Sequence, residues 1–119
     1  MKELRKKYWN PRNWDENFLT ENEFLFPFNT TLDKGDWTSW HEHPSWAEFV
    51  VLLSGSAVIE TTKLNFLANE SQCIWIPPRT SHTFYTLEAV NNRTIFVHES
   101  LFQGNERFYT SQMLSSTPL

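Results

Sequence analysis

The feature that most constrains this chain is a succession of short segments rich in Val, Ile, Thr, Phe, Tyr and Trp. Turn-forming residues bound each segment, and the segments recur at about 8–12 residues, the spacing of antiparallel sandwiches and barrels. No long amphipathic helical pattern separates them. We therefore predict an all-β domain. The expected strands are residues 24–32, 46–53, 55–62, 72–76, 82–86 and 93–98.

The length of 119 residues suits a single domain. We expect residues 1–20 to form an N-terminal arm, residues 21–105 the β domain, and residues 106–119 a C-terminal tail that begins a linker or a helix. The motifs Lys34-Gly35-Asp36 and Ser54-Gly55 are typical of turns, and each lies between β-type segments. We therefore expect each of them to close a hairpin.

Composition excludes several functional classes. Aromatic residues make up 16% of the chain, which argues against disorder. The 10 Lys and Arg residues are outnumbered by 14 Asp and Glu residues, and the basic ones concentrate in residues 1–12. The acidic remainder is a poor match for a phosphate backbone, so we expect no nucleic-acid binding by this chain. The single cysteine, Cys73, and the lack of an apolar run of membrane-spanning length predict a cytoplasmic protein with no membrane contact.

Three of the four histidines occur in a pattern that predicts a metal site. His41 and His43 are two residues apart, so on a strand their rings share one face. Glu48 follows on the next segment, and His82 begins a later one. Imidazole and carboxylate ligands suit a divalent transition metal, namely Fe, Mn, Ni, Cu or Zn. The alternative is that these side chains are solvent-exposed on an edge strand or serve as polar lining without a metal.

The same stretch carries the first motif of the cupin family. That motif consists of Gly, five residues, His-x-His, three or four residues, Glu, six residues and Gly. The positions that match it are Gly35, His41, His43, Glu48 and Gly55.

The second cupin motif is only partly retained. Its fixed positions fall on Ser71, Pro77, Arg79, His82 and Thr86, and only the proline and the histidine match. The chain thus resembles a cupin over residues 35–86. The resemblance implies a single jelly-roll β-barrel whose cavity receives the metal ligands of the family. At the matching positions these are His41, His43, Glu48 and His82.

A narrower resemblance is to the N-terminal sensor domain of AraC-type transcription regulators. It rests on three stretches, which are residues 41–61 with a His-x-His-Pro start, residues 74–84 with the block IWIPPRTSHTF, and residues 93–102. Such regulators bind DNA through a C-terminal pair of helix-turn-helix units, and no pattern for these follows Gly104. The resemblance implies a ligand-binding sensor without the DNA-binding domain.

Four further residues are candidates for ligand binding. Trp37 and Trp40 precede the histidine pair and would stack on a planar or apolar ligand, or else fill the core or cover an interface. Phe84 shares the inward face of its strand with His82, whereas Tyr85 should face outward. Arg79, on the turn before His82, is either a surface charge or a clamp for a ligand carboxylate.

Two functional hypotheses remain open at this point. The first is a small-molecule binding domain, with or without a metal, of the sensor type. The second is a stand-alone metal-dependent enzyme of the oxygenase, isomerase or decarboxylase type, for which the sequence shows no clear additional acid or base. Exposed sheet edges and abundant aromatic residues also predict a homodimer.

Overall fold

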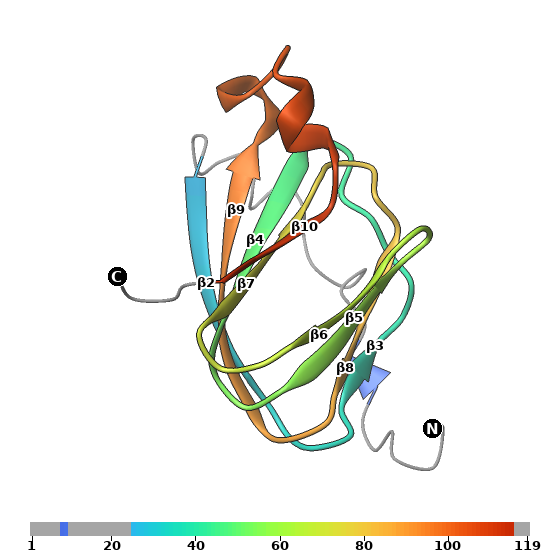
Figure 1. The fold of residues 1–119 in the computed structure, drawn as a ribbon, viewed down its shortest axis with the longest axis vertical. Coiled ribbons are helices and arrows are strands. Elements are labelled where there is room, and N and C mark those ends of the chain that lie inside the picture. Colours follow the sequence, from blue (N-terminus) through green and yellow to red (C-terminus); the bar gives the residue numbers. More distant parts are fainter. Residues whose placement is uncertain (1–7, 10–24, 116–119) are drawn as a thin grey trace.

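The computed structural model describes residues 8–9 and 25–115 of the chain, and these form strands and two short 3-10 helices (Figure 1). This confirms the predicted all-β fold. The rest of the expected N-terminal arm lies outside the described residues, and no described helix is long and apolar enough to cross a membrane. The elements are β1 (Tyr8–Trp9), β2 (Leu25–Leu32), β3 (Trp37–Thr38), β4 (Trp46–Ser54), β5 (Ala57–Thr61), β6 (Asn65–Ala68), β7 (Gln72–Ile76), β8 (His82–Thr86), β9 (Val90–His98), η3 (Glu99–Leu101), η4 (Glu106–Tyr109) and β10 (Gln112–Ser115).

The strands form two five-stranded sheets that face one another (Figure 1). The order is β1-β3-β8-β5-β6 in the first sheet and β10-β7-β4-β9-β2 in the second. All pairs are antiparallel except β1 with β3. Strands distant in sequence thus become neighbours, as β4 and β9 do along nearly their full length.

The prediction of two hairpin turns is wrong. Strand β4 pairs with β7 and β9, whereas β5 pairs with β6 and β8, so Ser54-Gly55 carries the chain from one sheet to the other. The turn at residues 34–36 likewise leads from β2 into the opposite sheet. Both edges of β4 are already occupied, so a hairpin partner has no place there. Gly55, with a φ of 88°, supplies the sharp change of direction.

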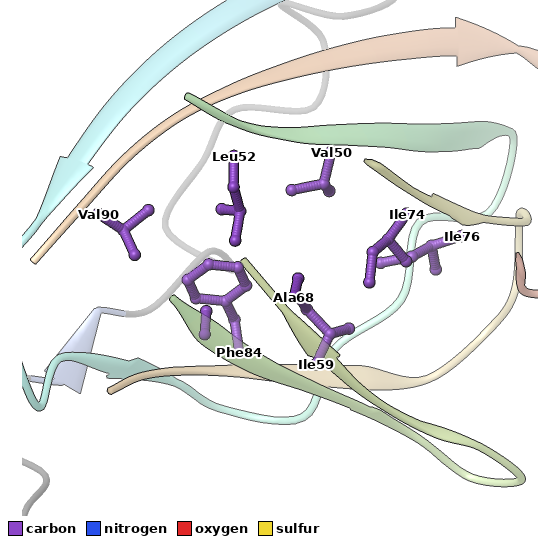
Figure 2. Close-up of a cluster of buried hydrophobic side chains, with 9 residues drawn as sticks. Val50, Leu52, Ile59, Ala68, Ile74, Ile76, Phe84 and Val90 are labelled. Carbon is purple, nitrogen blue, oxygen red and sulfur yellow. The ribbon is translucent and has the colours of Figure 1, made fainter. Parts of the chain in front are cut away.

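The core lies between the two sheets (Figure 2). Alternation along each strand sends every second side chain inward, as Ala57, Ile59 and Thr61 show on β5. Val50 and Leu52 of β4 pack in the same cluster as Ala57 and Ile59, from the opposite sheet. The buried hydrophobic residues of this cluster are Val50, Leu52, Ala57, Ile59, Ala68, Ile74, Ile76, Phe84 and Val90.

A second cluster covers the outer face of the second sheet. Trp75 points away from the main core and packs against Phe102 and Phe108, and its Nε1 donates a 2.8 Å hydrogen bond to the Phe108 carbonyl. The segment expected to begin a linker or a helix contains the 3-10 helix η4 and then β10. Strand β10 pairs with β7, because β7 would otherwise leave a row of backbone groups unpaired at the sheet edge.

Candidate metal centre

The predicted metal ligands come from both sheets and from the segment that connects them. Glu48 lies on β4 of the second sheet, and His82 is the first residue of β8 in the first sheet. His41 and His43 lie between β3 and β4, where only His41 makes a backbone bridge, to His82. Neither residue belongs to a named strand of either sheet, and the ring centroids of His41 and His43 lie 5.4 Å apart.

These residues form one tight group, called here the His/Glu cluster. Its members are His41, His43, Glu48 and His82, each of which offers a ligand atom within 4.8 Å of the others. The Oε1 atom of Glu48 lies 2.7 Å from His43 Nε2 and 3.1 Å from His82 Nε2. His43, Glu48 and His82 are buried, and His41 is partly exposed.

Backbone carbonyls determine which nitrogen of two histidines carries the proton. The Nδ1 atom of His41 lies 2.7 Å from the Ser39 carbonyl oxygen, and that of His82 lies 2.8 Å from the Thr80 carbonyl oxygen. Because a carbonyl only accepts, each Nδ1 is the protonated nitrogen. In the neutral imidazoles, both Nε2 lone pairs are therefore free to bind a cation. Carbonyl partners of this kind orient metal-ligating histidines in many proteins.

The His82–Glu48 contact and the donor set of the cluster bear on whether a metal fits. When Nδ1 carries the only ring proton of His82, its Nε2 lone pair lies 3.1 Å from a carboxylate oxygen, and two acceptors need a proton or a cation between them. Three imidazoles and one carboxylate are a donor set that transition metals bind. The residues present thus fit the predicted metal.

Burial and mutual contacts shift the ionisation of the cluster. Burial alone would raise the pKa of Glu48, but His82 and His43 outweigh it and hold this pKa well below its usual range. Burial and the nearby His82 lower the pKa of His41 to about 4. At neutral pH, Glu48 is therefore a carboxylate and His41 a neutral imidazole, which are the forms that bind a metal.

A cavity of about 60 Å³ opens from the cluster between the sheets. By volume, it has room for roughly four water molecules. Its walls are largely apolar, with a few polar side chains among them. The lining residues outside the His/Glu cluster are Phe28, Thr30, Leu32, Thr38, Val50, Ile76, Phe84, Asn92, Thr94 and Phe96.

The candidate ligand-binding residues lie in different places. Phe84 lines the cavity as expected from its position two residues after His82. Trp37 lies on β3 opposite Tyr85 of β8, and neither belongs to the cavity lining. Tyr85 points away from the cavity, yet it is only 3% exposed, so it does not face solvent. Trp40 is 44% exposed and also lies outside the lining.

Arg79 makes contacts within the protein at the edge of the site. Its guanidinium forms two hydrogen bonds to the Glu99 carboxylate, of 3.0 and 2.7 Å, and a third to the Pro44 carbonyl. Its backbone N–H donates to the His43 carbonyl at 2.8 Å. Arg79 does not line the cavity of the His/Glu cluster, and the carboxylate that it binds belongs to the chain itself.

Sequence reasoning missed the polar wall of the cavity. Thr30, Asn92 and Thr94 line it from β2 and β9, and none was a candidate. The predicted strand began at Arg93, because the pair Asn91-Asn92 is typical of a turn. The alternation Asn92, Thr94, Phe96 is visible in the sequence only when the strand is extended back to Val90, as it is in the structure.

Comparisons with known proteins add to this geometry. No protein-family model and no curated protein matches the chain. Among solved structures, a conserved protein of unknown function from Streptococcus pyogenes is 30% identical with a TM-score of 0.59, over 64% of this chain and 66% of that one. The cupin domain of Cnp3 from Schizosaccharomyces pombe is 13% identical with a TM-score of 0.62, over 71% and 62% of the two chains. The chain has the cupin fold.

A third similar structure is an enzyme with a metal. Oxalate decarboxylase of Bacillus subtilis, which contains Mn(II) centres, is 22% identical to this chain with a TM-score of 0.58. The match covers 83% of this chain but only 26% of the enzyme. This cupin-fold chain therefore corresponds to about a quarter of that enzyme, and at this identity the likeness concerns the fold.

Proposed function

We propose that this cupin domain binds a small molecule in the cavity of the His/Glu cluster, with a divalent transition metal held by the cluster. The observation that carries the proposal is the contact between His82 Nε2 and the Glu48 carboxylate, which needs a cation or a proton. Once bound, such a metal supplies an open coordination position that polarises an oxygen or nitrogen atom of a ligand. Ser39 and Thr80 hold two of the imidazoles in the matching orientation.

The lining of the cavity favours binding over catalysis. Among the described residues that line it, the ionisable side chains all belong to the His/Glu cluster. A general acid or base has to lie within hydrogen-bond reach of the reacting group. With the four cluster residues engaged as ligands, this part of the chain offers no additional group for that role. We therefore propose a sensor-type domain, similar to the ligand-binding half of AraC-type regulators.

The alternative is a metal-dependent enzyme. The likeness to a decarboxylase with Mn(II) centres is the observation in its favour. Metal-dependent release of CO₂ from oxalate by the purified protein would establish the enzyme and contradict the sensor proposal. We expect no such turnover, because the cavity lining offers no cation against the second carboxylate of oxalate.

The metal is tested first, by plasma mass spectrometry of untagged protein purified without chelators. We expect about one divalent metal per chain in the wild type and none in the His41→Ala/His82→Ala double variant. His98→Ala is the matched control, because His98 bonds to Ser100 at the start of η3 and lies outside the cluster. If wild-type protein stays metal-free after incubation with Mn, Fe and Zn salts, the cluster is polar lining and the proposal fails.

The location and the oligomeric state of the domain are also part of the proposal. We propose a cytoplasmic homodimer, in which a second copy covers exposed apolar side chains at the edge of the first sheet. Leu67 on the edge strand β6 is 54% exposed, and Leu64 just before it is 46% exposed. Sedimentation as a monomer at all concentrations would contradict the dimer.

A further inference from the structure

One buried polar atom in the cavity has no partner among the described residues. Asn92 on β9 is only 6% exposed and lines the cavity, yet its Oδ1 atom receives no hydrogen bond in the part of the chain that the structure describes. Buried polar side-chain atoms nearly always have a hydrogen-bond partner, since an unpaired one costs free energy. Asn92 therefore calls for a donor that the described residues do not supply, and a bound ligand can bring one into the cavity.

Strand register places Asn92 at the end of the cavity remote from the His/Glu cluster. On the adjacent strand β4, Glu48 is level with Phe96, whereas Leu52 is level with Asn92. The two positions on β9 are four residues apart, which is about 13 Å along a strand. Asn92 thus lines the part of the cavity that lies away from the cluster.

Other polar groups adjoin Asn92. Thr30 of β2 is its direct cross-strand neighbour, and Thr94 is the next inward-facing residue of β9. Both line the cavity, and a threonine hydroxyl both donates and accepts. The rest of the cavity wall is largely apolar and includes Val50, Ile76 and Phe84.

The charge of the cavity restricts the ligand further. Among its described lining residues there is no Lys or Arg, and the carboxylate of Glu48 belongs to the cluster end. A charged group at the Asn92 end would be buried without a partner of opposite charge, which is strongly unfavourable. The remote end of the ligand is therefore uncharged.

We infer that Asn92, with Thr30 and Thr94 beside it, forms a subsite for an uncharged hydroxyl or N–H group at the end of the ligand remote from the His/Glu cluster. This inference rests on the proposed function only in taking the cavity as the ligand site. It does not require that the metal be bound, and the two can therefore fail separately.

The test is a titration of isotope-labelled protein, followed by NMR at the side-chain amide signals of Asn92. The probes are 2-propanol, acetone and acetate, which have the same number of non-hydrogen atoms and suit a cavity of about 60 Å³. Only 2-propanol is both uncharged and a donor. We expect it to shift the Asn92 signals saturably, and acetone and acetate to leave them nearly unchanged. The titration is run on metal-free and on Zn(II)-loaded protein.

Two leucine variants provide the matched comparison. Asn92→Leu keeps the branched shape of the side chain and removes its acceptor, whereas Asn91→Leu makes the same change on the exposed face of β9. With signals of the neighbouring Thr94 as the reporter, we expect 2-propanol to bind Asn92→Leu about tenfold more weakly than wild type. Asn91→Leu should bind it as the wild type does. Both variants should keep the wild-type metal content, because neither residue belongs to the cluster.

The outcomes separate the two proposals. A response to acetone or acetate as large as that to 2-propanol would show that the subsite does not select an uncharged donor. If no probe shifts the signals, a water molecule satisfies Asn92 and the subsite is overturned. Equal binding by wild type and Asn92→Leu would also overturn the subsite. If the protein binds no metal but the 2-propanol response persists, the metal proposal fails and the subsite stands.

Discussion

At the scale of single residues, Arg79 connects three segments around the site. Its φ of 58° is in the left-handed region, which costs a non-glycine residue roughly 1 kcal/mol or more. Its contacts offset this cost. The backbone N–H of Arg79 donates a hydrogen bond to the His43 carbonyl, and its guanidinium donates to the Pro44 carbonyl and the Glu99 carboxylate. Arg79 therefore ties the loop of the His/Glu cluster to η3.

The Arg79–Glu99 pair makes stability depend on pH in a defined window. Hydrogen bonds from Arg79 and then from Tyr109 lower the pKa of Glu99 from its ordinary value of 4.5 to about 2. A carboxylate with a lowered pKa in the folded state stabilises the fold above its unfolded pKa, and this contribution is lost as pH falls toward the folded one. The loss therefore occurs between about pH 4.5 and pH 2.

The measurement is urea unfolding of wild type and Glu99→Gln across pH 7 to pH 2. We expect the wild type to be more stable by roughly 1 kcal/mol at pH 7, the scale of partly exposed ion pairs, and the difference to vanish by the acid end. Other groups titrate in both proteins, so the difference isolates Glu99. A difference that is constant across this range would show that the carboxylate charge does not stabilise the fold.

At the scale of elements, the strands are recognisable from local pattern, but their ends and partners are not. β6 was missed because its sequence, NFLA, is short and carries residues that strands disfavour. β10 was missed because its pairing with β7 depends on an edge that only the assembled sheet possesses. The turn at Gly55 looks like a hairpin in the sequence and crosses between the sheets in the structure.

A comparison of Gly55 with Gly104 tests whether the close approach of Gly55 to the Ala89 carbonyl requires a glycine. Both have a positive φ, of 88° and 89°, so an alanine is strained at either position. A Cβ on Gly55 would also overlap the Ala89 carbonyl oxygen, whereas one on Gly104 would meet nothing. We expect Gly104→Ala to lower the free energy of unfolding by about 1 kcal/mol and Gly55→Ala to lower it by clearly more. Equal losses in urea unfolding would refute the role of the close approach.

At the scale of the whole molecule, the His/Glu cluster joins the two sheets. Glu48 belongs to one sheet and His82 to the other, and the histidine pair comes from the connection between them. A metal bound by all of them would bind the folded chain and not the unfolded one. It would therefore add to the free energy of unfolding by mass action.

Metal removal tests this coupling by calorimetry with and without a chelator. At a metal concentration 100 times the dissociation constant, the added stability is about 2.7 kcal/mol, which corresponds to a rise in Tm of about 10 °C. We expect the chelator to abolish that rise in the wild type and to have no effect on His41→Ala/His82→Ala. A wild-type Tm that is insensitive to both metal and chelator would refute the coupling.

The sequence by itself determined the all-β class and the identity of the four clustered side chains. The class follows from short β-type segments bounded by turn formers. The four side chains follow from the resemblance to the two cupin motifs, through the spacing from Gly35 to Gly55 and then through Pro77 and His82. The sequence could not show that His41 pairs with His82 through an isolated β-bridge.

Only the tertiary structure decided which strands are neighbours, where Arg79 finds its carboxylate, and that Asn92 lies in the cavity. Glu99 is 20 residues from Arg79, and the β9 strand that carries Asn92 pairs with β4 and β2 from distant parts of the chain. The physical reason is that periodicity is a property of adjacent residues. Strand pairing, burial and ion pairing depend instead on which surfaces the whole chain brings together.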